Sequence, residues 1–457
     1  MLYILFYLLL LLFFIINYAF VRGDYFHPTI IFNFTFLIAT LFCILNAQEY
    51  AIEFNGGTVF IVTISMLVFT IITVLSKKIF KTNTFTFKNK LKYLYVSKSL
   101  IFTIIIIQIL NLIFFYRYEQ ALFSAYVGGR GSFSQIINNY DQLVKFFTED
   151  LVGLGVRSPF FYRVFNSFIS PISYVIIYII CHNYVATRRI DKFQLLVPCL
   201  FAIQIFMTGS RGSLFKILTF ILVVFYILLL RNKGLSKLSS RFAFKVLIVV
   251  VAVAPLFVLY LNATGRSGGV GQDGIIEALN RELFKYIGAP LLNFNNFIAG
   301  HDPYRSDSVY WGEQTFYGFY KFLYSKLHLI DFNIKSIIGS DSFVKSTNGL
   351  PTGNVFTTFY TFFYDFTYFG IIPLVSVIAL YFVPTYSRIL GTEYCAKKYL
   401  FDYKLFIYAY LFNDVIMLIF SNRFFESILT VGFLRFLITS AILVWIIKQN
   451  IVFKYKK

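Results

Sequence analysis

Long apolar runs separated by short polar loops dominate this chain. A helix needs about 20 apolar residues to cross the hydrocarbon core of a bilayer, and runs of this length recur along the sequence. We predict about eleven membrane-spanning helices, at residues 2–21, 28–46, 57–76, 98–116, 164–184, 194–208, 212–230, 243–261, 357–383, 403–421 and 429–447. The run at 357–383 is long and contains Pro373, which predicts a kink or an interfacial first half.

The composition agrees with a membrane protein. Of 457 residues, 58% are hydrophobic and 14% are charged, whereas soluble domains average about 25% charged residues. The first run, at 2–20, has no basic segment before it and no small-residue cleavage site, so we expect a retained span and not a signal peptide. We predict one all-α polytopic membrane domain over residues 1–457.

The net charge of +20 is distributed unevenly. Lys and Arg gather in every second loop, which is the positive-inside pattern of a cytoplasmic face. These basic segments are 77–98, 188–192, 231–245, 388–398 and 448–457. The N-terminus is then expected outside and the C-terminus inside. Because the cations follow the loops in this way, we expect no nucleic-acid partner.

Two longer loops, at 117–163 and 262–356, fall on the outer side of this arrangement. The second loop is too apolar and aromatic to be disordered. We expect short amphipathic helices on the membrane surface within it, for example at 275–287. Structured loops longer than about 15 residues are usually functional, so the chemistry is expected on this side.

Cofactor chemistry has no signature in the sequence. The four cysteines are scattered, and the four histidines include no pair at zinc-site spacing. The chain also contains no Walker pattern and no dinucleotide-binding glycine motif. We therefore expect neither a metal nor a cofactor, and no ATP-driven transport.

Arginine between glycine and serine marks two candidate phosphate sites. The segment TGSRGSL at 208–214 carries Arg211 between Ser210 and Ser213 in a short outer turn. A guanidinium offers a fixed fork for phosphate oxygens, so this turn is a candidate diphosphate site; the alternative is an arginine that reaches lipid headgroups. Arg266, in the glycine-rich segment 262–271, is a second candidate, with a flexible loop entry as its alternative.

Asp365 is an acidic residue in the otherwise apolar segment 357–383. Ionisable residues at membrane depth are costly and usually paired or functional. We expect Asp365 either to pair with Arg211 or to act as a general base.

The loop segment 300–316 brings further polar chemistry together. His301 and Glu313 are candidates for activating a sugar hydroxyl. Tyr310 and Trp311 are candidates for stacking on sugar faces. The alternative is a solvated polar loop with an interfacial aromatic anchor.

These segments resemble the Wzy-type oligosaccharide repeat-unit polymerases of bacterial surface polysaccharides. The matching pieces occur in the family's order: TGSRGSL at 208–214, YIGAPLLNFNNF at 286–297, YWGEQTFYGF at 310–319 and TGNVFTTFYTFFYDFTYFG at 352–370. The resemblance covers roughly residues 200–385, and the span layout extends it to nearly the whole chain.

The resemblance implies a C-type glycosyltransferase-like helical fold with two long periplasmic loops in the bacterial inner membrane. It implies transfer of a growing glycan from undecaprenyl diphosphate to an incoming lipid-linked repeat unit, without metal or nucleotide, for O-antigen or capsule. Both substrates and the membrane lipid are then partners, and a chain-length regulator is a further candidate.

On the same basis, the catalytic candidates are Arg211, Asp365, His301 and Glu313. Diphosphate binding is assigned to Arg211, Ser210, Ser213 and Arg266, and sugar binding to Tyr310, Trp311, Asn354 and Tyr364.

Two other functions remain open. An O-antigen ligase shares the architecture but transfers finished chains to lipid A-core, and the segment at 352–370 disfavours it. A lipid-linked oligosaccharide flippase would show evenly spaced spans with short loops, which the loop at 262–356 disfavours.

Overall fold

A computed structural model describes residues 2–80, 91, 93–145, 147, 153–233, 275–330, 336–337, 343–391 and 401–455. This part of the chain is mainly helical, with one antiparallel pair of short strands. Eight of its helices are long and apolar enough to cross a membrane. They are α1 (Leu2–Phe20), α2 (Pro28–Leu45), α3 (Gly56–Phe80), α4 (Lys98–Val127), α7 (Phe160–Thr187), α9 (Arg211–Lys233), α14 (Phe359–Gly391) and α17 (Val431–Tyr455).

The chain is therefore an all-α multi-pass membrane protein. Two more expected spans, at 194–208 and 403–421, coincide with the shorter helices α8 (Lys192–Met207) and α15 (Tyr403–Ile416). The expected span at 243–261 lies outside the described residues. α4 continues past the expected end at 116 to Val127, so the helix extends into the predicted loop at 117–163.

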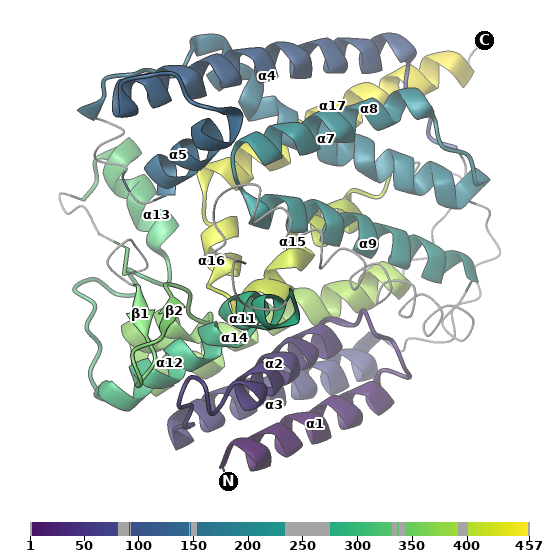
Figure 1. The fold of residues 1–457 in the computed structure, drawn as a ribbon. Coiled ribbons are helices and arrows are strands. Elements are labelled where there is room, and N and C mark those ends of the chain that lie inside the picture. Colours follow the sequence, from purple (N-terminus) through teal and green to yellow (C-terminus); the bar gives the residue numbers. More distant parts are fainter. Residues whose placement is uncertain are drawn as a thin grey trace.

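The long helices lie side by side with alternating direction (Figure 1). α1, α3, α7, α9, α14 and α17 end at one end of the bundle, which we call the basic face. The opposite end, the loop face, carries α5 (Phe133–Lys145), α11 (Ile275–Ile287), α12 (Ala289–Gly300), α13 (Tyr317–Phe322), α16 (Arg423–Ile428) and the strands β1 (Val344–Lys345) and β2 (Pro351–Gly353). A π-helical turn (Leu323–Leu327) follows α13, and a 3₁₀ turn (Met417–Ile419) follows α15. α11 confirms the predicted helix at 275–287.

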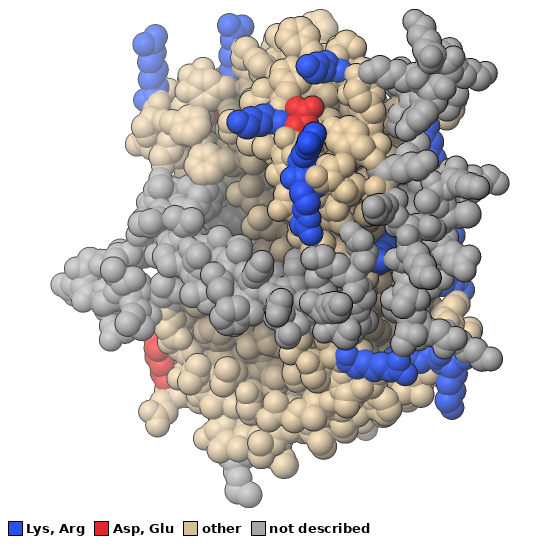
Figure 2. All heavy atoms as spheres, turned by 90° about the vertical axis from the view of Figure 1, so that its right-hand side faces the viewer, with Lys and Arg blue, Asp and Glu red and all other residues tan. Residues whose placement is uncertain are grey.

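Lys and Arg outnumber Asp and Glu on the basic face among the described residues (Figure 2). One arginine there also joins helices. Arg231 Nη2, near the end of α9, donates to the Ile389 carbonyl (2.6 Å) and lies 2.9 Å from Asp402 Oδ2 at the start of α15. Arg231 therefore joins the ends of α9 and α14 to the start of α15.

The turn between α1 and α2 carries a buried carboxyl group, Asp24. Asp24 accepts hydrogen bonds from the Tyr226 hydroxyl (2.6 Å) on α9 and the Tyr386 hydroxyl (2.5 Å) on α14. Burial raises the pKa of Asp24, and the two hydroxyls oppose that rise. This carboxyl group ties the first helix pair to the middle of the bundle.

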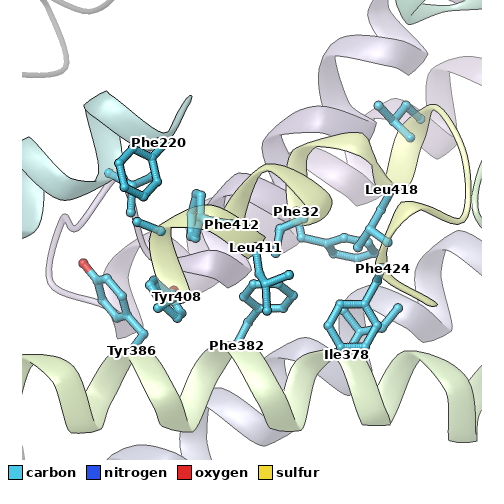
Figure 3. Packing of buried hydrophobic residues seen from close by; sticks show 14 of the residues in the cluster. Phe32, Phe220, Ile378, Phe382, Tyr386, Tyr408, Leu411, Phe412, Leu418 and Phe424 are labelled. Carbon is cyan, nitrogen blue, oxygen red and sulfur yellow. The ribbon is translucent and has the colours of Figure 1, made fainter. Parts of the chain in front are cut away.

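Aromatic side chains fill the core between α14, α15 and α9 (Figure 3). The Phe382 ring of α14 lies 5.9 Å from Tyr408 and 6.3 Å from Phe412 of α15, and 5.6 Å from Phe424 of α16. Offset and edge-on aromatic pairs contribute about 0.5–1.5 kcal/mol each beyond their buried area. The abundant Phe and Tyr therefore act here as packing residues.

α14 is broken at Thr367, where φ is 54° and ψ is −146°. The kink expected in this span therefore exists, but it lies before Pro373 and not at it. A β-branched residue at positive φ is strained by roughly 1–3 kcal/mol. The strain is offset by the contacts of the loop segment that binds beside the break.

Candidate functional site

Asp365 holds the loop segment 306–315 against the broken part of α14. Its Oδ1 accepts hydrogen bonds from the Ser308 hydroxyl and from the Gln314 amide (3.2 Å), and its Oδ2 accepts from the Thr315 amide (2.5 Å). The side chain is buried. Three donors to one buried carboxylate make Asp365 primarily an anchor for this loop.

The backbone break supplies a second attachment for the same loop. In a regular helix the Tyr364 carbonyl would accept from the amide four residues later. Here it accepts from the Ser306 hydroxyl (3.1 Å) and the Asp307 amide (3.4 Å). The strained Thr367 conformation thus leaves a carbonyl available to the loop.

Glu313 lies in the interior of this loop. Its Oε2 accepts from the Tyr310 amide (2.9 Å) and its Oε1 from the Gln314 side chain (3.4 Å). The Tyr320 hydroxyl donates to the Trp311 carbonyl (2.7 Å). Burial raises the pKa of Tyr320, and the charges of Asp365 and Glu313 add to the rise.

His301 has the geometry of an oriented base. Its Nε2 is hydrogen-bonded to Asp307, and its ring lies 4.2 Å from Phe297 and 6.3 Å from the Tyr364 ring. A carboxylate at one ring nitrogen fixes the orientation and tautomer of the imidazole and leaves the other nitrogen as an acceptor. Of the three expected base candidates, His301 is therefore the best placed to accept a proton.

The turn at 208–210 packs against α5 of the loop face. Gly209 has φ +65°, and a Cβ added there would lie 2.9 Å from the Asp141 Cβ. Ser210 and Ser213 hydrogen-bond to each other (2.8 Å) at the start of α9. The backbone of Arg211 begins that helix, but its side chain, like all of Arg266, lies outside the described part of the structure. Asn354 is half-buried between β2 and α14.

Two adjoining cavities open beside the start of α9. The larger, of about 1040 Å³, is a groove between α7 and α17. The smaller, of about 400 Å³, extends it toward α9, α15 and α16. Asn166, Ser167 and Arg435 line both, so the two cavities adjoin at these side chains.

The groove has apolar walls and a cationic border. Its walls are made mostly of aliphatic and aromatic side chains: Phe160, Val164, Phe168, Val431, Leu434, Ile438 and Ile442. Arg163 and Arg435 stand at its border, and Arg435 Nη1 donates to the Ser167 hydroxyl (3.0 Å). Apolar walls with a few placed polar groups are typical of small-molecule sites.

The smaller cavity contains a lysine within a membrane-spanning helix. Lys216 Nζ lies 4.0 Å from Asp414 Oδ1 and 3.9 Å above the centroid of the Tyr410 ring. Asp414 is buried, and its Oδ2 has no hydrogen-bond partner among the described residues. Lys216 is therefore held by a carboxylate and a ring but keeps hydrogen-bonding capacity toward the cavity, since an ammonium has three donors.

α16 connects the cavities to the loop anchored by Asp365. Just before it, Asn422 Nδ2 donates to the Thr315 carbonyl (2.8 Å), and the Phe425 ring lies 5.4 Å from Phe316. Ser427 of the same helix and Thr430 after it line the smaller cavity. The cationic space and the polar loop therefore border the same short helix.

Lys216, Arg435 and Asp414 were not among the residues selected from the sequence. Each is an ionisable residue inside a predicted span, the same signal that drew attention to Asp365. Applied to every span, that rule would have found them. Their association in one space depends on the packing of α7, α9, α15 and α17 and could not be read from spacing.

Among the described residues, no three His, Cys, Asp or Glu side chains form a group suited to a metal ion. Comparisons of the chain with protein families, with curated proteins and with solved structures found no match.

Proposed function

We propose that this protein polymerises undecaprenyl-diphosphate-linked oligosaccharide repeat units into a surface polysaccharide, O-antigen or capsule. The observation that supports it best is the apolar groove between α7 and α17, which continues into a space lined by Lys216 and Arg435. A polyprenyl diphosphate has a matching division into an apolar chain and a dianionic head.

The dimensions of the groove suit a lipid entering from one leaflet. Its lining residues span 160–168 on α7 and 431–442 on α17, which correspond to about 12 Å and 17 Å of helix at 1.5 Å per residue. That is about half of a hydrocarbon core roughly 30 Å thick. The groove would accommodate part of a polyprenyl chain in the leaflet next to the loop face.

The cations suit the leaving group of a glycosyl transfer. In the proposed reaction an acceptor hydroxyl attacks the anomeric carbon, and the bond from that carbon to the diphosphate oxygen breaks. The electron pair leaves with undecaprenyl diphosphate, and Lys216 and Arg435 stabilise the growing negative charge. Arg211, about 7.5 Å before Lys216 along α9, is the expected third cation.

The proton of the acceptor hydroxyl needs a base at the loop face. His301, oriented by Asp307, is our first candidate, and Glu313 is the second. Asp365 then acts by holding the loop that carries them. Tyr310, Tyr364 and Asn354 are the proposed sugar contacts.

The charge of the loops supports a site outside the cytoplasm. By the positive-inside rule the basic face is cytoplasmic, so in the bacterial inner membrane the loop face would be periplasmic. Lipid-linked repeat units would be polymerised there without a nucleotide sugar.

The test is the surface polysaccharide of a strain lacking this gene, complemented with the parent chain, Lys216→Met or Lys404→Met. Lys404 is an exposed lysine at the start of neighbouring α15 on the basic face, which makes it the matched control. We expect long chains with the parent and the control, and core plus one repeat with Lys216→Met at equal protein level.

If the Lys216→Met protein still makes long chains, Lys216 is not part of the proposed site. Bare core in the uncomplemented strain would instead indicate a ligase or a flippase.

A further inference from the structure

The loop face carries exposed apolar side chains close to a membrane-spanning helix. Tyr304, Val309 and Trp311 are 83%, 75% and 74% exposed, and Arg305 between them is exposed as well. We call these four residues the aromatic tip. Single exposed apolar residues are ordinary, but three large ones within residues 304–311 of one loop segment point to a partner.

The tip is continuous with the lipid-facing side of α14. The Trp311 ring lies 5.0 Å from the Phe366 ring of that helix. Just after Phe366, Phe369 and Ile372 are 79% and 47% exposed. Because α14 is a candidate membrane span, we expect these two exposed side chains to face acyl chains. Trp311 stands at the end of that surface nearest the loop face.

The tip is held in a defined geometry. Gly312 has φ +69°, and a Cβ there would lie 2.7 Å from Phe316 and 2.8 Å from Phe366. Trp311 can therefore approach Phe366 because glycine follows it. The Trp311 carbonyl accepts from Tyr320, so the exposed ring belongs to an ordered loop.

We propose that the aromatic tip inserts into the headgroup–acyl boundary of the leaflet at the loop face. Trp311, Val309 and Tyr304 occupy that boundary, where amphipathic aromatic rings are enriched. Arg305 contacts lipid phosphate there; no partner for its side chain is found among the described residues. The proposal gives Trp311 a role other than sugar stacking and does not depend on the reaction proposed above.

The consequence concerns the loop that contains Glu313. Since Trp311 is two residues before Glu313 and Asp365 fixes the other side of the loop, insertion sets the height of this loop above the membrane. A substrate whose lipid lies in the same leaflet would then meet the loop at a constant distance.

The chain has two tryptophans, which makes the test direct. Trp445→Phe leaves Trp311 as the sole tryptophan, and Trp311→Phe leaves Trp445, an exposed residue of α17. Trp445 is about 21 Å along that helix from its start at the loop face and three residues before Lys448, where the apolar stretch ends, so it lies near the opposite membrane boundary. It therefore serves as the reference for a tryptophan at a membrane boundary.

Each full-length variant is reconstituted into phosphatidylcholine–phosphatidylglycerol vesicles that contain lipid brominated near either end of the acyl chain. We expect Trp311 emission to be blue-shifted and quenched mainly by bromines near the headgroup. Trp445, near the opposite boundary, should be quenched by the same bromines. Arg305→Ala in the Trp445→Phe background should make Trp311 more accessible to acrylamide.

The proposal is overturned if neither brominated lipid quenches Trp311 fluorescence and acrylamide quenches it fully. Loss of acrylamide quenching on addition of lipid-linked substrate, without quenching by bromine, would do the same and return Trp311 to the sugar site. Unchanged Trp445 quenching in the Trp311→Phe protein shows that a variant is folded and inserted.

Discussion

Replacing Asp365 by asparagine distinguishes an anchor from a catalytic base. The carboxylate accepts from Ser308 and Gln314 at one oxygen and from Thr315 at the other. Asparagine keeps one acceptor oxygen and turns the other into an NH₂ group that faces a donor. At least one charge-assisted hydrogen bond is lost while the shape is nearly unchanged.

The size of the effect follows from those bonds. A hydrogen bond to a charged group contributes about 1.5–3 kcal/mol, which corresponds to a change of about 10- to 150-fold in an equilibrium constant. The loop segment 306–315 should therefore open about 10- to 150-fold more often. Polymerisation should fall because the loop is displaced and not because a proton acceptor is missing.

Hydrogen–deuterium exchange of the reconstituted protein, followed in peptides that cover 306–316, measures this opening. The matched control is Asp302→Asn, just before this loop, since Asp302 is exposed and its hydrogen bond from the Tyr304 amide is one that an asparagine oxygen also accepts. If Asp365→Asn abolishes polymerisation while exchange at Gln314 and Thr315 stays at the parent rate, the anchor interpretation is wrong and Asp365 is the base.

Three further results are expected. Arg435→Ala removes a cation and its bond to Ser167, and we expect KM for the lipid-linked donor to rise about 10- to 150-fold in reconstituted vesicles; an unchanged KM would exclude Arg435 from the diphosphate site. Gly209→Ala meets both φ +65° and the Asp141 side chain, and it should lower the unfolding free energy by about 1–3 kcal/mol, whereas Gly56→Ala, with open space around it, should not. EDTA should leave polymerisation by the purified protein unchanged, and inhibition would refute the metal-free proposal.

The length and periodicity of the apolar runs were sufficient to predict the coarse helical architecture. Apolar runs predicted the long helices, and the amphipathic pattern of 275–287 predicted α11 with the same ends. The position of Pro373 was a poor guide to the position of the kink in α14. The kink in α14 lies at Thr367 because the loop at 306–307 binds the Tyr364 carbonyl there, a long-range contact with no local signal.

In the candidate site, too, the sequence indicated unusual residues but not their contacts. Asp365 was noticeable as a charge in an apolar run, but its three partners come from a loop about 50 residues away in the sequence. Lys216 and Arg435 carried the same signal, yet nothing in their spacing placed them at one cavity. Helices α7, α9 and α17 bring them there.

By itself the sequence determined that this chain is a helical membrane protein and which of its loops are basic, because hydrophobic length and local charge act residue by residue. The tertiary structure alone decided where α14 breaks, what Asp365 holds, and that Lys216 and Arg435 line one space at the end of an apolar groove. Those features depend on side-chain contacts between helices distant in sequence, which hydrophobic periodicity does not specify.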